Sequence, residues 1–301
     1  MRCFFFIAAV LLGSAASRTP LFRLPPSLDL SNASLVRVNP ASSPPDATVI
    51  TFWRVGSLRP QPAAWDPGAW TGVELPASAL RALLPAAANT TAIQYANATF
   101  GALLDVFATP IQPGQSLGTI TIEHNWGPLA RVAPWAPAGG ALDLEIEYQA
   151  PLAQRAGVAI YSSWTVGIAH RTTQSFVWWE TALWDFGRPL GGDELWLDTI
   201  TGSPIVHAVL SPAPSAFHTR APDSALSSNA TWSGFRRFHF SVAAAQVAAA
   251  IVAANAKFNL SLGTDAGDWL LVHTNVELEC TSGAKGGHSL RAAAIDWVRA
   301  P

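Results

Sequence analysis

The strongest constraint on the fold of this chain is a series of short alternating segments between residues 116 and 298. The clearest runs from Ala141 to Tyr148, where Leu, Leu, Ile and Tyr alternate with Asp, Glu and Glu. Successive side chains of a strand point to opposite faces, so this pattern predicts a half-buried strand. Further strands are expected at 119–123, 157–164, 175–185, 193–200, 204–210, 235–241, 269–280 and 288–298.

One helix is expected among these strands. Ser241 is a suitable N-cap, and residues 242–256 are rich in Ala, with Val247 and Ile251 four positions apart. A membrane span needs roughly 20 apolar residues, and this segment is shorter and contains Gln246. Many closely spaced strands with one late α-helix predict a mostly β protein, a β-sandwich of jelly-roll type.

The first 17 residues have the pattern of a secretory signal peptide. Arg2 precedes an apolar run from Phe4 to Leu12, and small residues follow up to Ser17. The run is shorter than the roughly 20 residues that cross a bilayer. We expect cleavage after Ala16 or Ser17 and a secreted, extracellular protein with no membrane attachment once the signal is removed.

The remaining chain shows no clean domain boundary. Residues 18–115 are rich in Pro and Ala, and we expect an N-terminal segment there that contributes the first strands of the same domain or stands apart from it. Residues 116–300 are predicted to form the jelly-roll domain.

Export has two further consequences. With Cys3 in the signal, the mature chain keeps only Cys280, which is either a buried thiol or an intermolecular link; its alternating apolar segment favours the buried thiol. Asn-x-Ser/Thr triplets become candidate glycosylation sites on exposed backbone. These triplets begin at Asn32, Asn89, Asn97, Asn229 and Asn259.

The composition limits the kinds of molecule that this chain is expected to bind. With 18 Lys and Arg against 20 Asp and Glu, the chain has no basic stripe for nucleic acid or anionic membrane. The seven His are scattered without zinc-type spacing, so we expect no metal and no cofactor. The 13 Trp and 14 Phe either fill a core or stack on sugar rings. The oligomeric state is left open.

The segment 176–184 carries the most unusual pattern. Period two places Phe176, Trp178, Glu180 and Trp184 on one strand face, and the opposite face has the composition of a core. An acid between large aromatics suits a groove in which rings stack on sugars and the carboxyl acts on the bond between them. An ordinary inward-facing strand with one paired Glu is the alternative.

A second acidic segment completes the candidate site. Glu277 and Glu279 share one face of their strand. Glycoside hydrolysis uses two carboxyl groups across one site, about 5–5.5 Å apart in a retaining enzyme. Glu180 and Glu279 are therefore candidate catalytic residues if their strands lie close in one sheet, and Glu277 is a candidate substrate contact together with Phe176, Trp178 and Trp184.

These residues carry a resemblance to family 12 glycoside hydrolases. Residues 180–184 and 187–191 resemble that family's nucleophile strand, in which a Glu precedes a Trp by four residues and a Gly…Pro-Ile-Gly turn follows. Its acid/base Glu lies four residues before a Gly, as Glu279 does before Gly283. The resemblance implies a concanavalin A-like jelly roll and retaining endo-hydrolysis of a β-1,4-glucan or xyloglucan-type polysaccharide, with Glu180 as nucleophile and Glu279 as acid/base.

The chain departs from the family pattern at three places. Ala182 stands where the family has Met, and Cys280 stands where it has Pro. The family's Asp that orients the nucleophile has its nearest match in residues 161–163, which are Tyr-Ser-Ser. Two alternatives therefore stay open, a non-catalytic, lectin-like carbohydrate-binding protein on the same fold and a structural glycoprotein whose Trp are core.

Overall fold

The computed structural model covers most of the segments on which the predictions rest. The signal peptide, Asn32, Asn89 and Asn97 lie outside the described residues. The described residues are 17–28, 36–38, 44–53, 92–96, 98–105, 116–136, 139–155, 160–186, 189–198, 201–281 and 284–299.

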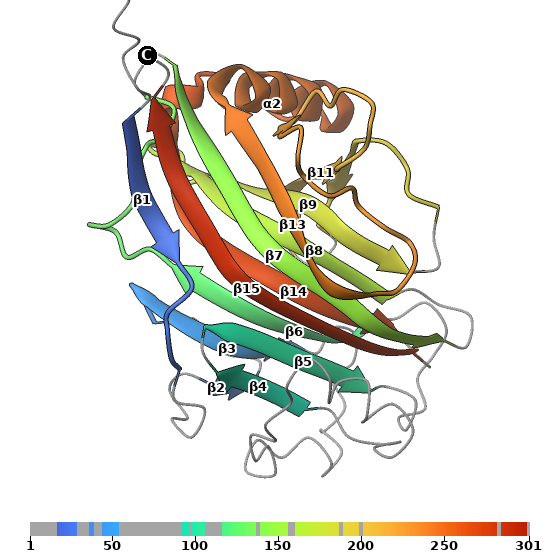
Figure 1. The fold of residues 1–301 in the computed structure, drawn as a ribbon. Coiled ribbons are helices and arrows are strands. Elements are labelled where there is room, and N and C mark those ends of the chain that lie inside the picture. The colour runs from blue at the N-terminus through green and yellow to red at the C-terminus, as the bar shows by residue number, and fades with distance from the viewer. Residues whose placement is uncertain are drawn as a thin grey trace, which may run out of the picture.

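Two sheets form the molecule (Figure 1). One has seven strands in the order β12-β13-β7-β15-β5-β4, with β1 also paired to β15. Its strands are β1 (Ser17–Arg23), β4 (Ala92–Ala96), β5 (Thr99–Asp105), β7 (Gly140–Arg155), β12 (Thr219–Arg220), β13 (Trp232–Ala243) and β15 (Ala284–Arg299).

The second sheet has eight strands in the order β10-β11-β9-β8-β14-β6-β3-β2. Pairing is antiparallel except for β11 with β9 and β2 with β3. Among the described residues, two sheets and one α-helix confirm the predicted β-jelly-roll sandwich. The strands of this sheet are β2 (Val36–Val38), β3 (Ala47–Trp53), β6 (Ser116–Asn125), β8 (Ile160–His170), β9 (Phe176–Phe186), β10 (Glu194–Leu197), β11 (Pro204–Val209) and β14 (Trp269–Thr281).

The late helix exists but begins two residues after the expected start. α2 spans Ala244–Phe258, because Val242 continues strand β13 and pairs with Leu142. Ala243 is the N-cap, and its N–H donates to the Gln246 side chain at 2.8 Å. A 3-10 turn, η3, follows at Ala266–Asp268. Within the described residues, no helix combines the length and apolar character needed to cross a membrane.

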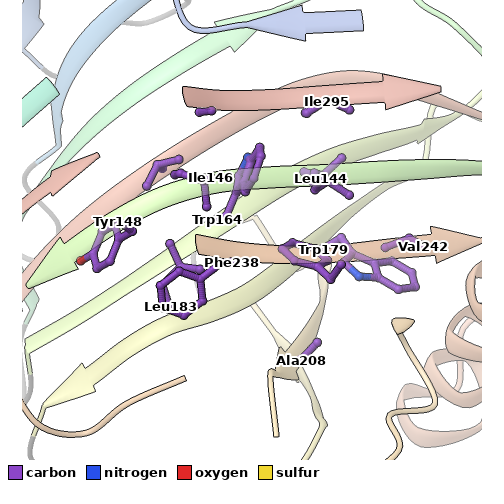
Figure 2. Close-up of a cluster of buried hydrophobic side chains, with 14 of the residues drawn as sticks. Leu144, Ile146, Tyr148, Trp164, Trp179, Leu183, Ala208, Phe238, Val242 and Ile295 are labelled. Carbon is purple, nitrogen blue, oxygen red and sulfur yellow. The ribbon is translucent and has the colours of Figure 1, made fainter. Parts of the chain in front are cut away.

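The core lies between the two sheets. Figure 2 shows Leu144, Ile146, Trp164, Trp179 and Phe238 meeting there from β7, β8, β9 and β13. Each of these side chains is almost fully buried, so the sandwich is held by contact between large apolar groups, as interiors packed to crystal density require. Cys280 is also fully buried, and its thiol donates to the Leu104 carbonyl at 3.7 Å. The expected buried thiol is therefore confirmed.

Strands from the first 115 residues belong to both sheets. β4 and β5 extend one sheet beyond β15, whereas β3 pairs with β6 in the other. β1 pairs with the end of β15, so that Ser17 lies opposite Arg299. Arg18 forms ion pairs with Asp143 and Asp296 at the same place.

A histidine is buried among the apolar side chains of the core. His288 on β15 has no exposed surface, and its Nδ1 lies 3.3 Å from the Tyr148 hydroxyl and 3.4 Å from the Ser162 hydroxyl. Ser162 in turn donates to the backbone carbonyl of Glu277. Burial lowers the pKa of His288 to about 3, because the charged imidazolium cannot be solvated there.

This buried imidazole should make the fold sensitive to acid. His288 is neutral when folded but binds a proton near pH 6.5 when unfolded, so its stabilising contribution is complete above that pH and is lost as the pH falls toward 3. We predict that His288→Gln, which does not titrate, loses less unfolding free energy than the wild type between pH 7 and pH 4.5. Urea denaturation at both pH values measures this, and equal losses in the two proteins would contradict it.

Candidate functional site

The eight-stranded sheet has one apolar and one polar face. Its apolar side chains pack toward the seven-stranded sheet, and the opposite side of β9, β8, β14 and β6 carries carboxyl and hydroxyl groups. We call this the polar face. Every residue of β8 is buried, so hydroxyl groups such as those of Ser163 and Thr165 need hydrogen-bond partners within the protein. The two bond each other at 3.0 Å.

Glu180 lies on this face with two polar neighbours. Its Oε2 accepts a hydrogen bond from the Tyr161 hydroxyl at 3.2 Å and lies 3.4 Å from His207 Nδ1. The Glu180 side chain is 15% exposed. Trp196 stacks on His207 with ring centroids 4.4 Å apart. Glu180 is thus oriented by groups from β8 and β11.

Tyr161 and His207 were not predicted as site residues. Tyr161 lies in the segment where the family pattern has an orienting Asp. Its hydroxyl donates a hydrogen bond to the Glu180 carboxylate. His207 was among the scattered histidines, and no sequence pattern distinguished it from the others. It is brought here because β11 pairs in parallel with β9, so that His207 lies opposite Glu180.

Glu277 is the acid that interacts with Glu180 directly. Its carboxyl group shares a hydrogen bond with that of Glu180, and its Oε1 accepts from the Ser163 hydroxyl at 2.7 Å. Burial, followed by the charges of Glu180 and Glu279, raises the pKa of Glu277 well above its usual value. The raised pKa means that Glu277 keeps its proton to higher pH than an ordinary carboxyl group does.

Glu279 lies farther along the same strand. It is opposite Tyr161 on β8 and Thr119 on β6, whose hydroxyl lies 3.4 Å from Glu279 Oε2. Through the strand register, Glu180 is level with Asn275, four residues from Glu279 and about 13 Å along the strand. Glu277 is two residues, or about 7 Å, from that level. The predicted acids therefore share one face, with Glu277 nearer to Glu180.

The aromatic residues separate into two groups. Phe176 and Trp178 lie on the polar face beside Glu180, with ring centroids 4.4 Å apart. Trp184 does not, which corrects the expectation that it lines a groove. A bulge between Ser162 and Ser163 leaves Leu183 without an opposite residue, so the following side chain turns to the core. Trp184 is fully buried there against Trp232.

A cavity of about 590 Å³ opens at the Trp178 end of the polar face. Phe176 and Trp178 line one side, and Asn125, Trp126 and Arg131 line another. The walls combine aromatic rings with amide, hydroxyl and guanidinium donors. This composition suits a polar ligand with flat apolar faces, such as a sugar. Throughout the described ranges, no group of three or more His, Cys, Asp or Glu is placed to hold a metal ion.

Comparison with known proteins gives matches only to solved structures. No family model and no curated protein matches the chain. The family 12 xyloglucanase of Bacillus licheniformis is 8% identical, with 67% of this chain and 84% of that chain covered and a TM-score of 0.39. A further structure of family 12 glycoside hydrolases is 13% identical over 69% and 86% of the two chains, with a TM-score of 0.34.

An endo-1,4-β-xylanase of Trichoderma reesei also matches, at 11% identity over 67% of this chain and 92% of that chain, with a TM-score of 0.28. Because function depends on the site rather than on the architecture, the function of this chain is argued from its own residues.

The raised pKa of Glu277 leads to a pH-dependent stability. The unfolded carboxyl ionises near pH 4.5, whereas the folded one resists ionisation, so its favourable contribution is complete below 4.5 and is lost as the pH rises through the folded pKa. We predict that Glu277→Gln becomes progressively more stable than the wild type from pH 4 to pH 8, by no more than about 1.4 kcal/mol per pH unit. Denaturant midpoints at several pH values test this, and a constant difference would contradict it.

The two Trp of β9 should respond differently to substitution. Trp184→Ala empties a core position and should lower the unfolding free energy by about 3–5 kcal/mol. Trp178→Ala removes a partly exposed ring from the cavity and should cost less stability. Thermal melting of the two variants measures the difference. Equal loss of stability in both variants would place Trp178 in the core as well.

Proposed function

We propose that this chain is a secreted glycoside hydrolase that cleaves within a β-1,4-glucan or xyloglucan-type polysaccharide with retention of configuration. One observation carries the proposal: Glu277, a buried carboxyl group whose pKa is raised, lies next to Glu180 on a face that continues into an aromatic cavity. Two carboxyls in different protonation states are what acid-assisted cleavage of a glycosidic bond needs.

The roles follow from the environment of each acid. The Glu180 carboxylate, held by Tyr161 and His207, attacks the anomeric carbon, and the bond to the leaving oxygen breaks as Glu277 gives that oxygen its proton. Water then attacks the glycosyl ester, Glu277 takes the proton of the water, and Glu180 is released. This reaction uses Glu277 where the family resemblance implied Glu279.

Glu279 contributes through its charge in this scheme. Its carboxylate is one of the groups that raise the pKa of Glu277, and so it helps to keep the acid protonated. The closeness of Glu180 and Glu277 supports retention, because inversion needs a wider gap of about 6.5–9.5 Å for a water molecule.

Export is part of the proposal. β1 begins at Ser17, so cleavage after Ala16 leaves that strand whole, and cleavage after Ser17 removes one residue of it. The side chains of Asn229 and Asn259 are exposed, as glycosylation requires. Glycans at these two positions and a polysaccharide partner outside the cell both fit a secreted protein.

A non-catalytic carbohydrate-binding protein is the second candidate. The observation that favours it is the limited access to Glu180, which is 15% exposed and flanked by Trp196 stacked on His207. A binder would use Trp178 and the cavity without needing a substrate at the carboxyl pair.

Substitution of the three acids distinguishes these functions. We predict that Glu180→Gln lowers the release of reducing sugar from soluble β-glucan and xyloglucan at least about 1,000-fold, with unchanged melting temperature. Glu277→Gln should lose a similar factor on polysaccharide but much less on aryl glycosides, whose leaving groups need no proton. Glu279→Gln should retain activity, with the alkaline limb of the pH profile moved to lower pH because the pKa of the general acid Glu277 falls.

Several outcomes would contradict parts of the scheme. Full activity of Glu180→Gln would end the hydrolase proposal. Loss of activity in Glu279→Gln with activity retained in Glu277→Gln would return the acid role to Glu279. Binding of glucan by the wild type with no hydrolysis of any β-glucan would leave the carbohydrate-binding function.

A further inference from the structure

The cavity beside Trp178 contains an arginine, Arg131, that forms no ion pair with any acid in the part of the chain that the structure describes. Arg131 follows β6, close to a β-bridge in which Leu271 N donates to the Val132 carbonyl at 2.8 Å. Its Nε is inaccessible to solvent and makes no hydrogen bond, and no described carboxylate forms an ion pair with its guanidinium. A buried guanidinium donor without an acceptor is costly to leave unsatisfied.

The remaining cavity wall neither neutralises this charge nor adds to it. None of the described residues that line the cavity is Asp or Glu. Burial lowers the pKa of His273, so that ring is neutral at neutral pH. The acids on flanking segments accept hydrogen bonds from wall residues: Asp46 from Gly127 N at 2.8 Å, Glu123 from Asn125 Nδ2 at 3.3 Å, and Asp198 from the Thr201 hydroxyl at 2.5 Å.

The adjoining part of the polar face has the opposite charge character. Glu180, Glu277 and Glu279 lie together there, and an anionic ligand placed over them would be repelled. Trp178 is two residues from Glu180 on the same strand face, so the two regions are continuous. One glycan chain crossing both would meet an acidic region and then a single cation among aromatic rings.

We propose that the Arg131 cavity binds an anionic sugar unit, a uronate or a sulfated sugar, carried on an otherwise neutral β-linked glycan. A carboxylate or sulfate forms charge-assisted hydrogen bonds with guanidinium, and the ring of the sugar stacks on Trp178 or Phe176. A polymer charged on every unit is disfavoured, because its neighbouring anions would lie over the glutamates. The inference extends the proposed function by naming its substrate class, but it concerns binding and does not require hydrolysis.

Binding of matched oligosaccharides tests this inference. Calorimetry at low salt compares a neutral β-1,4-linked oligosaccharide, the same backbone with one glucuronate, its carboxyl-reduced form, and a singly sulfated analogue. The wild type should bind the glucuronate or sulfate form about tenfold tighter than the neutral and reduced forms. The preferred anion identifies the source of the charge, and polygalacturonate should bind more weakly than either.

Three variants locate the effect. Arg131→Gln should lose the preference for the anionic sugar, and Arg131→Lys should keep part of it because the charge remains. Arg236→Gln removes the same charge from an exposed position on β13 of the other sheet and should bind like the wild type. Near-UV circular dichroism establishes that each variant is folded.

The results separate this inference from the hydrolase proposal. Equal affinity of the wild type for charged and reduced ligands, no binding of any ligand, or an unchanged preference in folded Arg131→Gln would each overturn the anionic-sugar site. Tight binding of the glucuronate form without cleavage would overturn only the hydrolase proposal. Cleavage of neutral glucan with no charge preference would overturn only the present inference.

Discussion

The burial of both faces of β8 is the constraint on which the rest of the molecule depends. This strand lies at the centre of the eight-stranded sheet, and all its residues are buried. One face must fit the apolar core through Trp164, and the other must satisfy hydroxyl groups away from water. The glutamates of β9 and β14 supply acceptors for Tyr161 and Ser163, so the acids serve the strand as much as the strand positions the acids.

The same constraint explains why one acid holds a proton. Three carboxyl groups near a buried strand cannot all be charged without strong repulsion and loss of solvation. Glu277 is the member with a raised pKa, and its hydrogen bond to Glu180 lets the pair carry one negative charge in place of two. In a purely structural sheet, crowded carboxyl groups would only be destabilising. With a glycan bound, the same crowding keeps a proton on a carboxyl group that can donate it to the glycan. Stability and chemistry are therefore linked through one carboxyl group.

The alternation of apolar and polar residues along the strands allowed much of this fold to be predicted from the sequence. The alternation in Ala141–Tyr148 and the composition of residues 242–256 were enough for strand β7 and helix α2, because both patterns reflect burial on one side. It also placed Glu277 and Glu279 on one face of their strand, and Glu180 on the face of its own strand opposite the core-like side chains. What it could not give was register between distant strands, which decides that Glu277 rather than Glu279 meets Glu180.

Local irregularities of the strands could not be predicted from the sequence either. Strict alternation assigned Trp184 to the face of Glu180, and one bulge opposite Ser162 and Ser163 reversed it. His207 lies in the site because β11 pairs in parallel with β9, and no local sequence pattern predicts that pairing. Arg131 lies outside any regular strand, where periodicity carries no information. The errors thus arose where the chain departs from regular strand geometry.

The position of β15 has a consequence for how the molecule assembles. This final strand is internal to its sheet, between β7 and β5, and it also holds β1 at its end. Three partners, all within residues 17–155, therefore cannot complete their pairing until residues 284–299 have been synthesised. Such long-range pairing is slow to form, and until it does, long strand edges stay open to wrong partners. A nascent chain of this kind depends on protection from aggregation until β15 is available for pairing.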